Sequence, residues 1–391
     1  MISEDRSASR RTFVRVAALG GVAGALAACA PAAAPAPAAA PQQPAAPAGK
    51  PDWEKKWDDL VVAAKKEGNL AVIMPVGAGW RKLMDGFEAQ FPGIKVEARQ
   101  FTATSQSVPV ITQERKAGVF AWDIWTGSPT IALPQLRTEG YLESIANAFI
   151  RPDVLEDKNW RDGFEGGWLD TAKSMGYTSQ AEGSGFLAID TNQVQEGEIK
   201  TFQDMLNPKW KGKITMADVR TGSTWGPMMS VRLQLGDDVV KRLIIDQQPT
   251  FTTQAREIAE SVVRGKSAFA VGSNAVVLND FVSQGIGQNV KLIDVEGMTY
   301  ISLSNGAWYQ MSKAPHPAAA QLFLNWIFTK DAQLLWGDQI KANSRRVDVP
   351  PADTLALPKP GRKYIKIGPE STLEESAKTQ KFLNDLLGIK N

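Results

Sequence analysis

Short apolar runs alternate with amphipathic helical patterns along most of this chain, and that alternation restricts its possible folds more than any other feature. Residues 70–75 (Leu-Ala-Val-Ile-Met-Pro) form a continuous apolar run, which is typical of a strand buried in a parallel sheet. An amphipathic helix is predicted next at residues 80–91, followed by a strand at 94–98. Strands and helices that alternate with short connections predict a parallel α/β sheet.

The same alternation continues to residue 140 and starts again near residue 185. In the first stretch the patterns also predict helices at 53–67, 109–118 and 129–140 and a strand at 119–126. In the second they predict strands at 185–190, 213–217, 268–271 and 290–295 and helices at 224–236, 253–264 and 274–285. A strand at 307–311 and two closing helices are expected to return to the first unit.

We therefore predict an α/β protein of two lobes, each with a parallel or mixed sheet flanked by helices. Residues 51–184 and 307–391 are assigned to lobe 1, and residues 185–306 to lobe 2. About 340 residues follow position 50, which is enough for two domains with substantial cores.

The N-terminus has the pattern of a bacterial export signal. Arg10 and Arg11 precede a short run of Ala, Gly, Val and Leu, as in twin-arginine signals. The run ends in Leu-Ala-Ala-Cys29, which resembles the lipobox of lipoproteins. Residues 1–28 are predicted to be the signal peptide, and residues 29–50 a lipidated Cys29 with an Ala/Pro-rich tether. An ordinary export signal with a chance cysteine is the alternative.

Composition excludes several function classes. The chain carries 44 Lys and Arg against 42 Asp and Glu, and it lacks the basic block that nucleic-acid recognition needs. Cys29 is its one cysteine, so we expect no disulfide and no thiolate metal site. We expect an exported, lipid-anchored monomer without a cofactor, in the periplasm or on the outer face of the cytoplasmic membrane.

Four predicted strand-to-helix junctions carry small residues that can donate hydrogen bonds. Ligands of open α/β sheets bind at the carboxyl ends of strands, where helix N-termini favour anions. The junctions contain Gly77 in the first, Gly127 and Ser128 in the second, Thr221, Gly222, Ser223 and Thr224 in the third, and Gly272, Ser273 and Asn274 in the fourth. Each taken alone fits ordinary turns and caps. Together they predict one cleft between two lobes.

The twelve tryptophans divide into two groups. Trp53, Trp57, Trp326 and Trp336 fall on apolar helix faces, so we expect them in the core. Trp80 and Trp225 each follow a Gly-rich junction, one in each predicted lobe, and we expect either ligand stacking or core packing for them.

Signs of catalysis are few. His316 is the one histidine, and its position between two prolines favours a turn role. The chain contains no nucleophile elbow, P-loop or zinc-protease motif. An exported hydrolase that uses a carboxylate pair remains the alternative from another function class.

Five segments resemble bacterial extracellular solute-binding proteins of ABC importers, in the group that includes ferric-ion, thiamine and phosphonate binders. They are residues 60–69, 87–96, 114–118, 208–213 and 314–326, and the resemblance spans about residues 53–350. It implies a type II periplasmic binding fold, in which two lobes close on a solute about a two-stranded hinge. It also implies delivery to the permease and ATPase subunits, and solute contacts from the four junctions and from Thr104 and Ser105.

One departure from that group concerns the ligand. Its ferric-ion binders carry adjacent tyrosines in the segment that corresponds to residues 272–275, which reads Gly-Ser-Asn-Ala here. We therefore expect an oxyanion-bearing solute, for which Arg220 is a candidate countercharge. Ferric ion, or a cationic aromatic solute held by Trp80 and Trp225, are the alternatives.

Overall fold

The computed structural model of this chain describes residues 51–273, 275–304 and 306–389. These residues belong to one compact unit of the chain, Lys50–Asn391. The predicted signal peptide and tether, Cys29 included, lie outside the described residues. Within the described ranges, no helix is long and apolar enough to cross a membrane.

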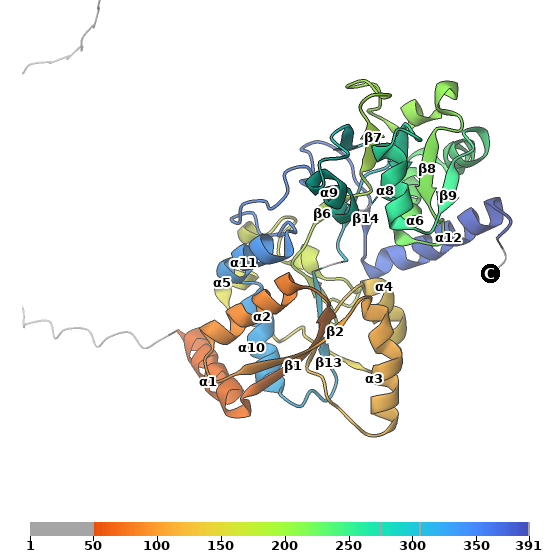
Figure 1. The fold of residues 1–391 in the computed structure, drawn as a ribbon. Coiled ribbons are helices and arrows are strands. Elements are labelled where there is room, and N and C mark those ends of the chain that lie inside the picture. Colours follow the sequence, from red (N-terminus) through yellow and green to blue (C-terminus); the bar gives the residue numbers. More distant parts are fainter. Residues whose placement is uncertain (1–50, 274, 305, 390–391) are drawn as a thin grey trace, which may run out of the picture. The chain divides into compact units, whose positions relative to one another are not determined.

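The first sheet has six strands and contains the parallel strands predicted near the N-terminus (Figure 1). They are β1 (Asn69–Pro75), β2 (Lys95–Phe101), β3 (Ile124–Thr126), β4 (Leu142–Glu143), β5 (Tyr177–Thr178) and β13 (Ala307–Met311). Strand β1 lies between β2 and β3 and runs parallel to both. Strand β13, the predicted return strand, pairs antiparallel with β3, β4 and β5.

Four of the helices of this lobe pack against one another in two pairs. The α-helices of the lobe include α1 (Asp52–Glu67), α2 (Ala78–Gln90), α3 (Ser107–Lys116), α5 (Pro152–Leu155), α10 (Pro317–Ile327) and α11 (Lys330–Ile340). Helix α1 lies against α10, and α2 lies against α11 (Figure 1). Helix α1 ends where predicted, because Gly68 adopts a left-handed φ of 71° and its N–H caps the carbonyl of Ala64. Of the four tryptophans expected in the core, Trp326 and Trp336 are buried, Trp57 packs against the same cluster, and Trp53 is half-buried.

Two predictions in this lobe were wrong in extent. The strand predicted at 119–126 covers only Ile124–Thr126. The helix predicted at 129–140 is a short α4 (Pro129–Ile131) followed by a π-helical segment, η2 (Ala132–Arg137). Pro134 lies inside that segment, and a proline removes the N–H that a regular α-helix needs there.

The second sheet repeats the local arrangement of the first. Its strands are β7 (Leu187–Asp190), β8 (Ile214–Ala217), β9 (Thr250–Thr252), β10 (Phe269–Val271) and β11 (Val290–Ile293). Strand β8 lies between β9 and β10 and runs parallel to both, whereas β7 pairs antiparallel with β10 and β11. The short strand β9 was not predicted from the sequence.

The helices of lobe 2 follow the predicted order. They are α6 (Gly222–Leu235), α7 (Asp237–Lys241), α8 (Ala255–Val263) and α9 (Ala275–Ser283), with the π-helical segment η7 (Arg242–Asp246) and the short 3₁₀ helices η5 (Phe202–Leu206) and η6 (Pro208–Trp210). The chain therefore folds into two α/β lobes, as predicted.

A small third sheet carries the chain between the lobes. Strand β6 (Glu182–Ser184) leads toward β7, and β12 (Tyr300–Ser302) leads back toward β13. These two strands pair antiparallel, which matches the predicted two-stranded connection. A third strand, β14 (Lys366–Ile367), pairs parallel with β12 and was not predicted.

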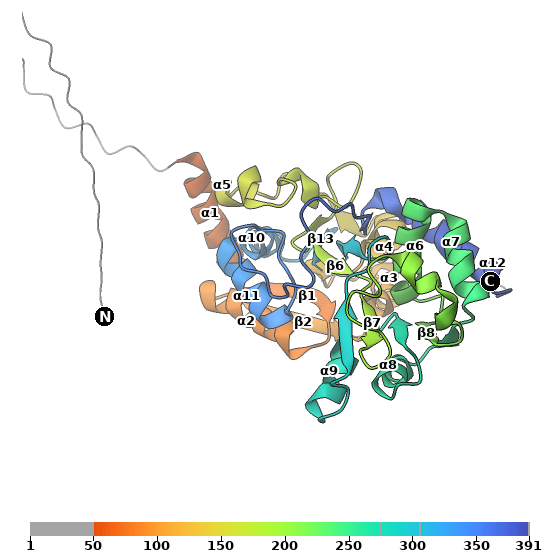
Figure 2. The same cartoon turned by 90° about the horizontal axis from the view of Figure 1, so that it is seen from above.

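The assignment of all C-terminal residues to lobe 1 was wrong. After β14 and η8 (Glu370–Thr372), the chain forms α12 (Leu373–Leu386), which packs against α6 of lobe 2 (Figures 1 and 2). Leu383 is fully buried there within the lobe 2 core. The chain therefore passes from lobe 1 to lobe 2 again, which is its third crossing between the lobes, because β14 adds to the connecting sheet and α12 buries an apolar face in lobe 2.

His316 lies at the N-terminus of α10, in keeping with the turn role predicted for it. Its backbone N–H and its ring Nδ1 both contact the carboxylate of Asp123, at 2.7 and 2.8 Å. That carboxylate is fully buried and also accepts the N–H of Ala71 at 2.7 Å. The Asp123 carboxylate therefore links the N-terminus of α10 to the first sheet through these hydrogen bonds.

Candidate solute-binding site

A cavity of 360 Å³ lies at the carboxyl ends of all three parallel strands in lobe 1. Pro75 ends β1, Thr102 follows β2, and Gly127 and Ser128 follow β3. This is the edge at which ligands bind in open α/β sheets. The complete lining is Pro75, Trp80, Thr102, Thr104, Thr126, Gly127, Ser128 and Ile340.

The structure brings four of the predicted lobe 1 residues into this single cavity: Trp80, Thr104, Gly127 and Ser128. Gly77 lies directly beside it, since a Cβ at that position would lie 3.4 Å from the Trp80 ring. Ser105 is exposed in the short helix η1 (Thr104–Gln106) and does not line the cavity.

The N-terminus of α2 lies next to this cavity, because Pro75 and Trp80, on either side of it in the sequence, both line the cavity. Helix α2 begins immediately after Gly77, and no side chain caps its first N–H groups. The first N–H groups of any helix lack an acceptor within the helix, and they carry the positive end of its dipole. Ser128 precedes α4, where its hydroxyl accepts the N–H of Thr130 and shares a 2.8 Å hydrogen bond with the Thr130 hydroxyl.

Trp80 is held in place by two buried tryptophans. Its ring makes edge-to-face contacts with Trp308 at 6.0 Å and Trp336 at 5.5 Å between ring centroids. Trp308 comes from β13 and Trp336 from α11, and both side chains are fully buried. The indole of Trp80 therefore presents a fixed apolar surface to the cavity.

Gly127 allows the strand end and the following loop to approach each other closely. A Cβ at Gly127 would overlap both the Trp125 ring and the Thr104 hydroxyl. The Trp125 indole donates a 2.9 Å hydrogen bond to Ser107, whose hydroxyl donates in turn to the carbonyl of Thr104 at 2.6 Å. This chain of bonds holds Thr104 against the cavity.

In lobe 2 the two predicted junctions also come together. They follow β8 and β10, which are parallel neighbours. Gly272 has a φ of 85°, and a Cβ there would lie 2.7 Å from the Cβ of Ala217 and 3.3 Å from Ser223. Ser223 is exposed and shares a 2.9 Å hydrogen bond with the hydroxyl of Thr221. The hydroxyl of Ser273 is buried and has no hydrogen-bond partner within the described residues.

Other predicted residues of lobe 2 have structural roles. Thr224 is fully buried, and its hydroxyl donates to the carbonyl of Ala217 at 2.7 Å. Trp225 packs against the lobe 2 core, which is the second of the two roles expected for it. Gly222 is the first residue of α6. Asn274 lies outside the described residues.

Arg220 is not an unpaired countercharge. Its Nε and Nη2 atoms donate to the two carboxylate oxygens of Asp218 at 2.7 and 2.6 Å. Hydrogen bonding to this guanidinium lowers the pKa of Asp218, so the pair stays ionised and its charges cancel. The lining of the lobe 1 cavity contains no charged side chain either.

Sequence reasoning missed part of this cavity. Thr102 and Thr126 each lie at the C-terminal end of a strand, and this position could have identified them as candidate site residues from the sequence. Ile340 ends α11, more than 200 residues from the other lining residues along the chain. Nothing in the local sequence marks Ile340, because only the packing of α2 against α11 brings it to the cavity.

The described residues offer little for a metal ion. No group of three or more His, Cys, Asp or Glu side chains among them could hold one. Burial raises the pKa of Tyr177, Tyr300 and Tyr309, which disfavours the phenolate form that binds ferric ion. Tyr177 and Tyr309 are fully buried in the core of lobe 1.

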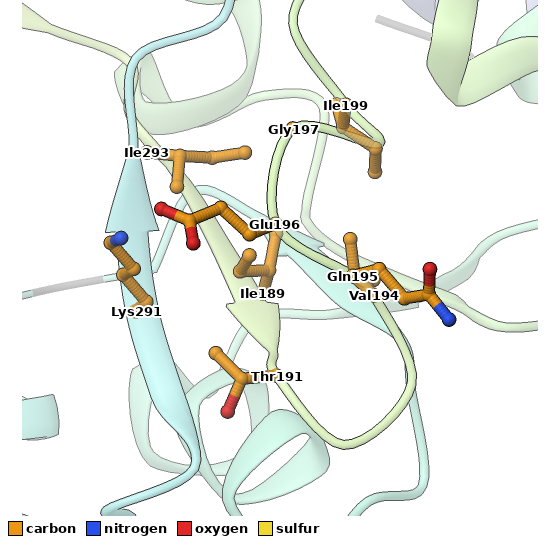
Figure 3. A pocket seen from close by; sticks show the side chains of 9 residues that line it. All are labelled: Ile189, Thr191, Val194, Gln195, Glu196, Gly197, Ile199, Lys291 and Ile293. Atoms are coloured by element: carbon orange, nitrogen blue, oxygen red, sulfur yellow. The ribbon is translucent and has the colours of Figure 1, made fainter.

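A different cavity, of 310 Å³, lies on lobe 2 beside β7 and β11 and contains none of the predicted site residues (Figure 3). Its lining combines the apolar Ile189, Val194, Ile199 and Ile293 with polar side chains that include Glu196 and Lys291. Figure 3 shows the side chain of Glu196 extending toward the strand that carries Lys291. It lies away from the carboxyl ends of the parallel strands, so we do not assign the solute to it.

Comparison with known proteins agrees with this architecture. Iron-bound HitA from Pseudomonas aeruginosa is 17% identical, with a TM-score of 0.59 over 81% of this chain and 99% of that protein. The Trichodesmium protein IdiA (FutA), in complex with iron and citrate, is 18% identical, with a TM-score of 0.63 over 83% and 100%. The Bordetella ferric binding protein is 15% identical, with a TM-score of 0.62 over 83% and 100%.

At these identities the similarity concerns the fold. No curated protein matches the chain. The sequence profile of one family, described as bacterial extracellular solute-binding protein, matches residues 82–345, which is more than half of the chain. The chain therefore belongs to the bacterial extracellular solute-binding protein family.

Proposed function

We propose that this protein is the lipid-anchored receptor of an ABC importer and that its solute is a small organic anion with a flat apolar body. Members of its family deliver small solutes to an ABC permease. The observation that carries the proposed solute class is the lobe 1 cavity, in which Trp80, near the start of α2, shares the lining with the hydroxyl-bearing Thr104 and Ser128.

The flat apolar body is inferred from Trp80. Its ring is fixed by Trp308 and Trp336, so a planar ligand can stack on it without further ordering of the side chain. Pro75 and Ile340 add apolar contacts on the same cavity. A bare metal ion or inorganic anion would leave this surface unused.

The oxyanion is inferred from the donors around the same cavity. The uncapped N–H groups at the start of α2 and the hydroxyls of Thr104 and Ser128 can donate to a carboxylate or phosphonate. From lobe 2, the Ser273 hydroxyl would add a donor on closure about the connecting sheet. The Thr221 hydroxyl already donates to the carbonyl of Asp218 at 2.7 Å, and the Ser223 hydroxyl bonds to that of Thr221. The proposed role requires no turnover of the solute.

Ferric ion is the second candidate, because HitA was solved with iron and IdiA with iron and citrate. It receives less support from this chain. The three tyrosines whose pKa burial raises are poor phenolate donors, and the described residues contain no acidic or histidine cluster for a metal.

A ligand panel tests the solute class. Thermal unfolding of the full-length protein would be measured with benzoate and phenylphosphonate (flat and anionic), propionate (anionic only), benzyl alcohol (flat only), thiamine, Fe(III) and Fe(III)-citrate. A true ligand at a hundred times its Kd raises the free energy of unfolding by about 2.7 kcal/mol. We expect the flat anions to stabilise most, and the ligand to be recovered unchanged. Stabilisation by ferric ion alone would contradict the proposal.

The anchor is tested separately. Cys29→Ser should move the protein from the membrane fraction to the soluble fraction of the host cell, because it removes the only thiol that lipid can modify. Release of the wild-type protein without detergent would contradict lipidation.

A further inference from the structure

The cavity of 310 Å³ beside β11, which we call the β11 cavity, lies at the margin of the lobe 2 core (Figure 3). Four aliphatic side chains of that core form its apolar floor: Ile189, Val194, Ile199 and Ile293. The same cavity is lined by one carboxylate, from Glu196, and one ammonium group, from Lys291. Small-molecule sites in proteins have volumes of about 300–1,000 Å³ and combine apolar surface with a few polar groups. The β11 cavity has both properties.

Lys291 lies on a face of the sheet that is otherwise apolar at this cavity. Strand β11 reads Val-Lys-Leu-Ile, and alternate residues of a strand point to opposite faces. Lys291 and Ile293 therefore share one face, on which Lys291 is directly opposite Ile189 of β7. Val290 and Leu292, on the other face, pack against the core formed with α8 and α9. A single ammonium group therefore stands among aliphatic side chains on the edge strand of the sheet.

Glu196 belongs to the loop that follows β7, residues 191–200, and this loop forms the other wall of the cavity. The buried carboxylate of Asp190 holds the base of the loop. It accepts the N–H of Asn192 at 3.0 Å and the side-chain amides of Gln193 and Asn289, both at 2.8 Å. These bonds fix the wall before any ligand binds, which lowers the entropy cost of binding.

The tip of the loop is closed by hydrogen bonds on both sides of Glu196. The N–H of Gln195 donates to the carboxylate of Glu198 at 3.0 Å, and the N–H of Glu198 donates to the carbonyl of Gln195 at 3.1 Å. Gly197 supplies the left-handed φ of 76° that this turn requires. Figure 3 shows the Glu196 side chain extending over the floor toward the strand that carries Lys291. Because both charged side chains are exposed, a solute can reach them.

Neither of these two charges has a partner. Within residues 51–273, 275–304 and 306–389, the side chains of Glu196 and Lys291 form no hydrogen bond or ion pair, either with each other or with another group. By contrast, the nearby Glu198 is paired with Lys209. Two opposite charges that line one cavity without bonding to each other match a ligand that carries both charges.

We propose that the β11 cavity binds a small zwitterion with an apolar body, which is the chemistry of an α-amino acid with a branched aliphatic side chain. Its ammonium group bonds to the carboxylate of Glu196, and its carboxylate bonds to the ammonium group of Lys291. Its side chain covers the aliphatic floor and removes apolar surface from water. The cavity shares no lining residue with the lobe 1 cavity, so this inference does not rest on the proposed function.

Isothermal titration calorimetry of the full-length protein with L-leucine tests the ligand class. Three probes each lack one of its features: 4-methylpentanoate has no ammonium group, 3-methylbutylamine has no carboxylate, and glycine has no apolar body. We expect leucine to bind about tenfold or more tightly than each of them, because each loses one set of contacts. No measurable binding of leucine, or equal binding of 4-methylpentanoate, would overturn the proposal.

Two variants test the assigned contacts. Glu196→Gln should weaken leucine binding about tenfold and remove the preference for leucine over 4-methylpentanoate. Lys291→Met should weaken it similarly and remove the preference for leucine over 3-methylbutylamine. Both residues are exposed, and circular dichroism would confirm that both variants fold. Glu139→Gln and Lys266→Met are the matched controls, because both residues are exposed and lie outside the cavity lining.

Trp80→Ala distinguishes the β11 cavity from the lobe 1 cavity, which Trp80 lines. This variant should bind leucine as tightly as the wild type does. Loss of leucine binding in Trp80→Ala, with binding intact in Glu196→Gln, would place leucine in the lobe 1 cavity and overturn the inference. A chain that binds no leucine would leave Lys291 with the role of an edge-strand charge that prevents pairing with other chains.

Discussion

At the scale of single residues, the two tryptophans that follow Gly-rich junctions have different roles, although their local sequences are alike. Trp80 lines a cavity and is braced by two buried tryptophans, whereas Trp225 packs on the core of lobe 2. Both have the same local sequence setting. The difference comes from what surrounds each ring in the fold.

This difference predicts opposite effects of two matched substitutions. Trp80→Ala should weaken binding of the best ligand from the panel by about tenfold or more, because stacking on an aromatic ring contributes about 1–3 kcal/mol. Trp225→Ala should lower the free energy of unfolding and leave affinity nearly unchanged. Isothermal titration calorimetry and urea unfolding separate the two effects. Equal losses of affinity would argue against the lobe 1 cavity as the aromatic subsite.

Asp123 is the second residue whose role depends on burial. Its fully buried carboxylate accepts the N–H groups of Ala71 and His316 and contacts the His316 ring. Asp123→Ala should cost about 3 kcal/mol or more of stability, because the buried N–H of Ala71 and the half-buried N–H of His316 lose their acceptor. His316→Ala, which removes only the ring, should cost about 1 kcal/mol. Urea unfolding checks this order, and an equal or larger effect of His316→Ala would refute it.

At the scale of elements, the packing of α2 against α11 positions the Trp80 platform. Gly79 and Gly86 both lie on α2 and both face α11. A Cβ at Gly79 would overlap the backbone carbonyl of Gln339, which cannot move without shifting α11. A Cβ at Gly86 would meet the flexible end of the Leu335 side chain instead.

Alanine at these two glycines should therefore behave differently. Gly79→Ala should destabilise the protein by about 3 kcal/mol and weaken ligand binding, because Trp80 is the next residue. Gly86→Ala should change stability by about 1 kcal/mol or less, since Leu335 can adjust and alanine favours helix. Thermal unfolding and titration calorimetry of both variants test this. Similar values for the two would show that the helix pair tolerates displacement.

At the scale of the whole molecule, the C-terminal segment crosses from lobe 1 through the connecting sheet to lobe 2. It is attached to lobe 1 by Glu370, which accepts a hydrogen bond from Arg137 at 2.5 Å and the N–H of Thr171 at 2.8 Å. Hydrogen bonding to Arg137 lowers the pKa of Glu370 to about 2 from its usual 4.5. The carboxylate is thus stabilised in the folded protein.

A lowered folded-state pKa makes stability depend on pH in a defined window. The contribution of Glu370 is complete above pH 4.5 and is lost as pH falls toward 2, because the unfolded chain binds the proton first. Glu370→Gln should therefore be less stable at neutral pH, with a shallower loss of Tm between pH 5 and pH 3. Glu165→Gln, in an exposed pair with Lys173, is the control and should follow the wild-type curve. An unchanged slope in Glu370→Gln would contradict this role.

Much of the fold could be predicted from local patterns. The alternation of apolar runs and amphipathic helices predicted β1, β8 and β10 and the helices around them, because these elements are defined by periodicity over a few residues. The prediction was wrong for η2, where Pro134 interrupts a helical pattern, and it missed the short strand β9. Strand β9 (Thr-Phe-Thr) offers no apolar run by which to recognise it, unlike the equally short β10 (Phe-Ala-Val).

The sequence by itself determined the two α/β lobes and the strand ends at which Thr104, Gly127 and Ser128 lie, because strand-to-helix junctions are local. Only the tertiary structure decided that Ile340 completes the cavity, that Trp308 and Trp336 brace Trp80, and that α12 joins lobe 2. These features depend on contacts between side chains that are far apart in the sequence, and only the packing of the whole chain brings such side chains together.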